Sequence, residues 1–192
     1  MTFDELKSLL AADRSYRIFD QSQRIPREIL EKLVDLTRLC ASGRNAQPLR
    51  YRLVTSEDEC AKVYEWLKWA GYYTDWDGPA EGERPAAYLV QCLDTEVGAN
   101  CLCDDGLHLQ AITLGAAALG YGCCIIKSFN VVEVAAALGI EARYQPRYVL
   151  AIGRPAETVR LEPQVGEEFK YYRTADGVHH VPKRSLAELI IG

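Results

Sequence analysis

The sequence predicts a single layered domain of the α+β or α/β class, and three observations support this prediction. Segments with apolar residues at helical spacing alternate along the chain with short, strand-like apolar runs. Such alternation is typical of sheets that are covered by helices. With 192 residues, of which 48% are apolar and 26% charged, the chain suits one domain with a sizeable core. Internal repeats are absent, so residues 1–192 are expected to form one unit.

The first expected elements are two helices and a strand. Apolar residues at helical spacing indicate helices near residues 2–11 and 26–39. Pro26 suits the start of the second helix, because proline lacks only an N–H group that the first turn leaves unpaired. Residues 49–54 alternate between apolar and polar side chains, which predicts a half-buried strand.

A helix over residues 57–69 and an aromatic loop over residues 70–85 are expected next. Five Gly and Pro residues interrupt the second segment, which also carries Tyr72, Tyr73 and Trp76. Because aromatic rings stack on planar molecules, these three side chains are candidates for a lid over a planar substrate.

The longest expected helix covers residues 100–119 and follows a strand over residues 86–93. Between Ala111 and Gly120 the sequence carries no charge. A helix that is apolar on most sides is buried on most sides, either in a large core or at a subunit interface. A short apolar strand over residues 123–126 follows it.

The last expected elements are a helix, a strand and a long extension. Asn130 is a suitable N-cap for a helix that Gly139 closes, and residues 148–152 form the last core strand. The extension over residues 156–192 is polar and irregular up to residue 184. Its closing residues 185–190 are apolar enough to dock, and we expect the extension to wrap a partner subunit.

Composition excludes several classes of protein. The net charge of −5 argues against general nucleic-acid binding, which requires a basic face. Residues 1–6 lack the basic start and apolar core of a signal peptide. No run approaches the roughly 18 apolar residues of a membrane span. We therefore expect a cytoplasmic protein with no nucleic-acid or membrane partner.

The seven cysteines are expected to be free thiols in a reducing cytosol. Three of them lie in apolar runs and are predicted core residues, namely Cys92, Cys123 and Cys124. Cys101 and Cys103 lack the second spaced pair of a structural metal site, so no metal is expected. His179 and His180 are expected to be exposed, and a metal-binding or structural module is kept as an alternative to an enzyme.

Two polar segments carry more hydrogen-bonding groups than their positions require. The turn Ser42–Pro48 joins a helix to a strand, which a Gly cap alone can do, yet it carries a hydroxyl, a guanidinium and two carboxamides. The segment Arg14–Arg17 combines two guanidinium groups with a hydroxyl, which is typical of phosphate sites. Lys183 and Arg184 form a further basic pair. A polar ligand is one interpretation, and solvated surface loops are the alternative.

Four segments together resemble the nitroreductase family of flavin-dependent oxidoreductases. Arg14-Ser15-Tyr16-Arg17 resembles the R-S-x-R phosphate motif of that family, and residues 42–48 resemble its S-x-x-N-x-Q-P loop. Residues 105–122 resemble the central dimerisation helix with its following turn. Residues 138–155 resemble the closing L-G-I and G-x-P pattern. The resemblance extends over nearly the whole chain.

This resemblance implies a three-layer α/β/α fold with a central, mostly antiparallel sheet, a dimer-forming central helix and a C-terminal extension. It further implies a homodimer with two FMN molecules at the subunit interface. The N-terminal and C-terminal basic groups would hold the phosphate, and the turn would contact the same FMN from the other subunit. Lys127 and Ser128 would lie near the reactive edge of the flavin ring. The implied FMN-binding residues are Arg14, Ser15, Tyr16, Arg17, Ser42, Arg44, Asn45, Gln47, Lys127, Ser128, Lys183 and Arg184.

The implied activity is hydride transfer from NADH or NADPH, through the flavin, to a nitroaromatic, quinone or similar planar acceptor in a ping-pong cycle. No catalytic residue beyond the flavin is expected, although Lys127 is a candidate for electrostatic support. A flavin reductase, a flavin storage protein and a flavin-based sensor are the alternatives. The aromatic loop stands where many members carry a longer helical insertion that sets substrate choice, and Leu49 replaces a frequent aromatic residue. The substrate class therefore stays open.

Overall fold

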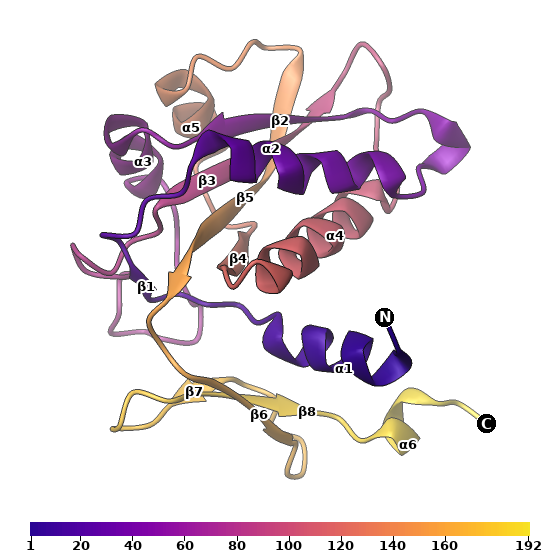
Figure 1. The fold of residues 1–192 in the computed structure, drawn as a ribbon, viewed down its shortest axis with the longest axis vertical. Coiled ribbons are helices and arrows are strands. Elements are labelled where there is room, and N and C mark those ends of the chain that lie inside the picture. The colour runs from indigo at the N-terminus through magenta and orange to yellow at the C-terminus, as the bar shows by residue number, and fades with distance from the viewer.

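A five-stranded sheet forms the centre of the protein, as the computed structural model of all 192 residues shows (Figure 1). The edge of the sheet is β2, and the order β2-β3-β5-β1 is completed by β4, which also pairs with β5. Every pairing in this sheet is antiparallel. The strands are β1 (Phe19–Asp20), β2 (Leu49–Val54), β3 (Ala87–Asp94), β4 (Gly122–Ile126) and β5 (Tyr144–Pro155).

Six α-helices accompany the strands, and most begin and end close to their predicted positions. The second helix continues into a 3-10 turn, Leu36–Leu39, so the predicted segment 26–39 is helical throughout its length apart from its cap. The side chain of Asn130 caps its helix by accepting a hydrogen bond from the backbone N–H of Glu133. The helices are α1 (Phe3–Ala12), α2 (Arg27–Asp35), α3 (Glu57–Tyr64), α4 (Asp104–Ala118), α5 (Val131–Ala137) and α6 (Leu186–Leu189).

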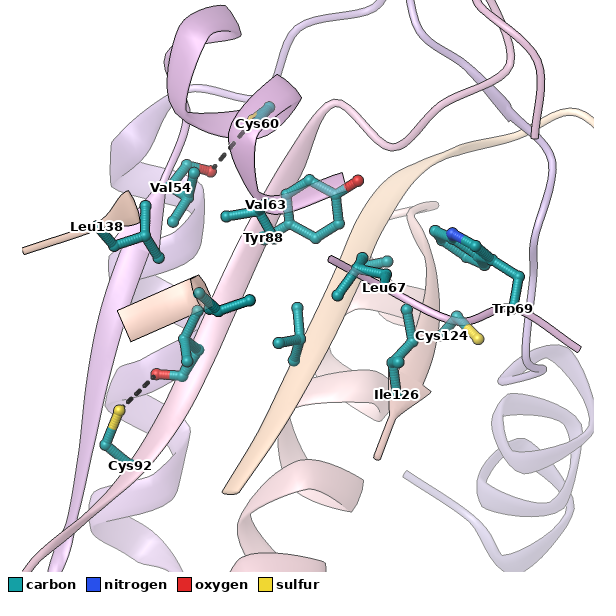
Figure 2. Packing of buried hydrophobic residues seen from close by; sticks show 14 residues of the cluster. Val54, Cys60, Val63, Leu67, Trp69, Tyr88, Cys92, Cys124, Ile126 and Leu138 are labelled. Carbon is teal, nitrogen blue, oxygen red and sulfur yellow. Dashed lines mark hydrogen bonds between the residues drawn. The ribbon is translucent and has the colours of Figure 1, made fainter. Parts of the chain in front are cut away.

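The helices cover both faces of the sheet, which confirms the predicted three-layer α+β fold. All eight residues of β3 are buried, and its side chains alternate between two apolar clusters. Tyr88, Val90 and Cys92 pack with α3 and α5 on one face (Figure 2). Ala87 and Leu89 pack with α2 and α4 on the other face. A central strand that is buried on both sides explains why its sequence is almost continuously apolar.

The predicted helix over residues 57–69 is wrong in its second half, because α3 ends at Tyr64. Beyond it the chain pairs with the residues that follow β4. The backbone N–H of Lys68 donates to the carbonyl of Ser128 at 2.9 Å, and Leu67 forms a bridge with Phe129. Pairing with a segment about sixty residues away in the sequence ends the helix, and local spacing does not record such a contact.

The prediction that residues 156–184 are irregular is also wrong. They contain a three-stranded sheet of β6 (Val159–Pro163), β7 (Tyr172–Arg173) and β8 (His179–Lys183). β8 pairs in parallel with β6 and antiparallel with β7. These strands are short, half-exposed and rich in charge, so their sequence lacks the alternation that would reveal them. Docking of the extension on a partner subunit stays a prediction.

Helix α4 packs on α2 and leaves one apolar face uncovered. A Cβ atom at Gly115 would lie 3.1 Å from a side-chain carbon of Leu33 in α2 and only 2.4 Å from one of Leu36 in the following 3-10 turn, so the absence of a side chain there allows these segments to approach closely. Leu107 of α4 is 44% exposed, and Leu119, which caps the end of the helix, is exposed to the same extent. The prediction that this helix is buried in a large core or at a subunit interface is not tested by the exposure of these side chains in a single chain, so its interface alternative stays a prediction. None of the helices combines the length and the hydropathy that a membrane-spanning segment requires.

We predict that Gly122→Ala destabilises the protein by about 1–3 kcal/mol, measured as the free energy of unfolding in urea. Gly122 begins β4, and a Cβ atom there would lie 2.6 Å from the ring of Tyr16 and 2.7 Å from the ring of Pro155. Gly106→Ala is the matched control, because a Cβ atom at Gly106 in α4 meets nothing within 4 Å. The control should be stabilised by up to about 1 kcal/mol. Equal stability of the two variants would contradict this packing.

Candidate functional site

The basic segment, defined as residues 14–17, is held against β4. Ser15 forms a parallel bridge with Cys123, and the backbone N–H of Tyr16 donates to the carbonyl of Cys123 at 2.9 Å. Two residues further on, the chain enters the sheet as β1. The sheet thus fixes the backbone from which both arginine side chains project.

Arg14 keeps hydrogen-bonding capacity that the protein does not use. Its Nη2 donates to the carbonyl of Leu10 at 2.7 Å, while its Nε is buried and has no partner. The neighbouring Ser15 is exposed. Tyr16 differs, because its hydroxyl donates to the carbonyl of Ala12 at 3.2 Å and burial raises the pKa of its phenol. Since an unpaired buried donor is costly, Arg14 fits a site that an anion completes.

Arg17 is buried, and its guanidinium group is held by the C-terminal extension. Its Nη1 donates to the carbonyl of Ser15 at 3.2 Å and to Nε2 of His179 at 3.1 Å. Its guanidinium carbon lies 4.7 Å from the centre of the Tyr171 ring, close enough for a cation–π contact. Its Nε and Nη2 groups, which these contacts do not engage, are the ones that remain for a ligand.

His179 is a site residue that the sequence did not reveal. It was expected to be exposed, but it is 1% exposed. Its Nδ1 is hydrogen-bonded to the hydroxyl of Tyr73. Burial, together with the charges of Arg17 and Arg173, lowers the pKa of His179 from 6.5 to about 4. A His-His pair on a polar segment carries no apolar pattern, so nothing in the sequence separates this buried ring from its neighbour.

Glu157 joins the basic segment to the start of the extension. Its carboxylate accepts hydrogen bonds from the backbone N–H groups of Arg17 and Ile18. The other carboxylate oxygen pairs with Arg173 at 2.8 Å, and the Glu157 side chain is 2% exposed. A buried carboxylate with this many charged and backbone donors is fully compensated. It fixes β6 and β7 relative to residues 14–17.

Lys183 is the last residue of β8, the strand that also carries His179, and Arg184 follows it. Lys183 is exposed, and Arg184 forms a 3.5 Å ion pair with Glu188. In Figure 1, β8 runs beneath α1, whose last turn leads into the basic segment. The structure therefore ties the strand that carries the C-terminal basic pair to the N-terminal basic segment of the same chain.

The turn over residues 42–48 is organised by Asp104, the first residue of α4. The Ser42 hydroxyl donates to the Asp104 carboxylate at 2.6 Å, and the Gly43 N–H donates to it at 3.0 Å. The same hydroxyl accepts the N–H of Gln47 at 2.9 Å. The hydroxyl of Ser42 thus uses its only proton within the protein. An acidic residue in the first turn of a helix is a recognisable sequence signal, but the sequence does not show which loop that residue binds.

The backbone of this turn adopts an uncommon conformation. Arg44 and Asn45 have φ values of 55°, and Gln47 has a φ value of 48°. Non-glycine residues in the left-handed region cost free energy and concentrate at binding sites. Asn45 accepts a hydrogen bond from the Gln47 side chain at 3.1 Å, whereas Arg44 is exposed. A cavity of about 290 Å³ adjoins the turn and reaches Asp104.

The basic segment and the turn lie at different positions along α4. Asp13, which precedes the basic segment, accepts a hydrogen bond from the Thr113 hydroxyl at 2.7 Å. Asp104 holds the turn at the other position. Nine residues separate these two contacts, which corresponds to a rise of roughly 14 Å along the helix. Within one chain the two predicted groups of ligand-binding residues are therefore not brought together.

Lys127 and Ser128 follow the C-terminal end of β4. The Lys127 ammonium donates to the carbonyl of Arg147 at 3.0 Å and lies 4.4 Å from the centre of the Tyr148 ring. Lys127 also lines a cavity of about 580 Å³ between α5 and β5. It is four residues beyond Cys123, the partner of Ser15, or roughly 13 Å along an extended strand. A ligand that touches both groups must therefore be elongated.

The aromatic loop packs against the C-terminal extension. The rings of Tyr72 and Tyr73 lie 4.9 Å and 5.3 Å from the ring of Tyr171. The guanidinium carbon of Arg173 lies 5.1 Å from Tyr73 and 5.2 Å from Trp76. These contacts hold the predicted lid to the extension, so the two segments form one surface.

Comparisons with known proteins match this chain to one family model. The family model described as "Nitroreductase family" matches residues 10–81 and 102–154, more than half of the chain. This match includes the basic segment, the turn and α4. A comparison with curated proteins finds no match.

Solved structures show the same fold at low sequence identity. A nitroreductase family protein from Clostridium difficile 630 is 19% identical, with a TM-score of 0.67 over 100% of this chain and 98% of its own. An FMN-dependent nitroreductase from Clostridium difficile R20291 is 17% identical, with a TM-score of 0.65 over 83% and 91%. The NADPH:FMN oxidoreductase of Vibrio harveyi, solved with NAD+, is 20% identical, with a TM-score of 0.63 over 85% and 72%.

Buried His179 predicts a pH dependence of stability. Between its ordinary pKa of 6.5 and its folded value of about 4, the unfolded chain binds more protons than the folded chain. The contribution of His179 to the free energy of unfolding is therefore complete above about pH 6.5. As the pH is lowered below this value, the free energy of unfolding decreases by up to about 1.4 kcal/mol per pH unit. Urea titrations from about pH 7 to about pH 5 should show a shallower loss for His179→Gln. Identical slopes for the variant and the wild-type protein would contradict this assignment.

Proposed function

The chain belongs to the nitroreductase family, and from this membership we propose that it is an FMN-dependent oxidoreductase. It takes hydride from NADH or NADPH and passes it to a nitroaromatic, quinone or similar planar acceptor in a ping-pong cycle. One observation carries the proposal. Two groups of polar residues, the basic segment and the turn, are attached to α4 at separate positions, beside apolar side chains of the helix that the chain leaves exposed.

The residues of the basic segment suit the FMN phosphate. A phosphate monoester carries a charge of about −1.5 to −2 near pH 7. Arg14 offers a buried, unpaired Nε group, and Arg17 offers the edge of its guanidinium that His179 does not use. The exposed Ser15 hydroxyl and the Lys183 ammonium supply further donors. Charge-assisted hydrogen bonds of this kind are the strong ones.

A homodimer would complete each site. In a two-fold dimer the same surface meets itself, so an axis that crosses the uncovered face of α4 places the turn of one subunit beside the basic segment of the other. The exposed apolar side chains of Leu107 and Leu119 would then become buried. Leu186 and Leu189 of α6, which are 72% and 67% exposed, offer a second surface for the partner subunit.

FMN, when bound, supplies the hydride chemistry at its ring, and the residues of this chain bind, orient and polarise it. Lys127 has its ammonium fixed by the Arg147 carbonyl and the Tyr148 ring. Its positive charge would favour an anionic ring, and this is its proposed supporting role. Arg44 and Asn45 would contact the FMN bound mainly by the other subunit. No proton transfer is assigned to a side chain.

The first test of the function is optical. The purified protein should be yellow, or become yellow with added FMN, and NADH or NADPH should bleach it under anaerobic conditions. Subsequent addition of a quinone should restore the colour, as a ping-pong cycle requires. A flavoprotein that neither nucleotide bleaches would indicate storage or sensing, and a chain that binds no FMN would exclude the proposed function.

A second test concerns the phosphate ligand. Arg14→Ala should weaken FMN binding by roughly ten-fold to over a hundred-fold, because a charged hydrogen bond contributes about 1.5–3 kcal/mol. The dissociation constant can be measured from the quenching of flavin fluorescence. Arg27→Ala is the matched control, since Arg27 forms only an exposed ion pair with Glu31 on α2. Equal FMN affinity in both variants would contradict the role of Arg14.

A further inference from the structure

We propose that His179 is a positioning residue that orients Arg17 toward the ligand phosphate, and that Tyr73 in turn fixes the orientation of His179. This inference rests on the proposed function, since the ligand is the FMN phosphate. It concerns a residue of the C-terminal extension and a residue of the aromatic loop, neither of which belongs to the motifs of the basic segment or the turn.

The hydrogen-bond directions in this group follow from the chemistry of its members. A guanidinium group can only donate, so Nε2 of His179, 3.1 Å from Arg17, must accept. The single ring proton of neutral His179 is then on Nδ1, which donates to the Tyr73 oxygen. Arg17 therefore donates to His179, and His179 donates to Tyr73. Only this tautomer of a neutral ring satisfies both contacts.

The surroundings keep His179 in this neutral state. Its ring is 1% exposed, and Tyr73 and Tyr171 lie against it at centroid distances of 5.8 Å and 5.2 Å. Arg17 and Arg173 place two positive charges nearby, and both oppose a third on the ring. Near neutral pH, His179 therefore remains an acceptor for Arg17.

Arg17 is consequently fixed from several sides and free on one edge. Nη1 is held by His179 and by the Ser15 carbonyl, and the face of the guanidinium lies on the Tyr171 ring. Glu157 does not compete for the guanidinium, because its carboxylate is used by two backbone N–H groups and by Arg173. Nε and Nη2 remain for the phosphate. A guanidinium that is already oriented loses less conformational entropy when it binds.

The effect of His179 on ligand binding should therefore depend on whether the ligand carries a phosphate. FMN and riboflavin share the same ring, and riboflavin lacks the phosphate. If His179 acts through Arg17, its loss should weaken FMN binding and leave riboflavin binding unchanged. If His179 only supports the packing of the aromatic loop, both ligands should be weakened alike.

The experiment measures both dissociation constants for full-length variants by flavin fluorescence. His179→Phe keeps a ring but no acceptor, and it should weaken FMN binding by about ten-fold with riboflavin binding unchanged. His179→Gln, which can accept from Arg17 and donate to Tyr73, should recover most of the affinity. His180→Phe is the matched control, because His180 stacks on Tyr172 and pairs with Glu162, away from Arg17. Unchanged FMN binding in His179→Phe, or an equal loss for both ligands, would overturn the proposal.

Two further measurements separate this inference from the proposed function. Tyr73→Phe removes the oxygen that accepts from His179 and retains the ring, so it should also weaken FMN selectively if His179→Phe fails to fold. Nitrogen NMR of the His179 ring in the ligand-free protein should show a protonated Nδ1 and an unprotonated Nε2. The opposite tautomer would overturn the inference even if FMN binds. A wild-type protein that binds no FMN but shows the expected tautomer would refute the proposed function alone.

Discussion

The length of α4 between its two polar attachments is the constraint on which the account of this protein depends. At its first residue, Asp104 holds the turn that contains Ser42, and further along, Thr113 holds the residue before the basic segment. A helix is rigid, so these two groups cannot approach each other within one chain. In the proposed dimer, a second subunit brings its turn beside the basic segment, so that both groups meet the same ligand. The apolar surface that α4 leaves exposed lies between the two attachments. Contact with a second subunit would bury it.

Much of the fold could be predicted from the sequence, because its core elements are locally encoded. The strand over residues 49–54 has the predicted bounds, and the Asn130 cap is confirmed. Errors occur where contacts between distant segments decide the structure. The helix predicted to reach residue 69 ends at Tyr64, since the following residues pair with the segment after β4. The small sheet of β6, β7 and β8 has strands too short and too polar to show a pattern.

The candidate site shows the same division. Sequence motifs pointed to the basic segment and the turn, whose backbones the structure holds in defined and partly strained conformations. They did not reveal Asp104, Glu157 or His179, which act by holding other residues. No sequence signal shows which residues they hold, because their importance arises from what the fold places beside them. The extension, expected to be irregular, is the element that buries His179 against Arg17 and meets the aromatic loop.

A mixed dimer distinguishes a site shared between two subunits from a site formed within one chain. One subunit would carry Arg14→Ala, and the other would carry Arg44→Asn with Asn45→Gly, replacements that tolerate the left-handed backbone of the turn. If each site combines the basic segment of one subunit with the turn of the other, the mixed dimer contains one intact site and one doubly damaged site. Titration should then show one FMN bound per dimer with wild-type affinity, although neither homodimer binds normally. Two weakened sites, with none of wild-type affinity, would contradict the shared site, since that result requires both groups to act within one chain.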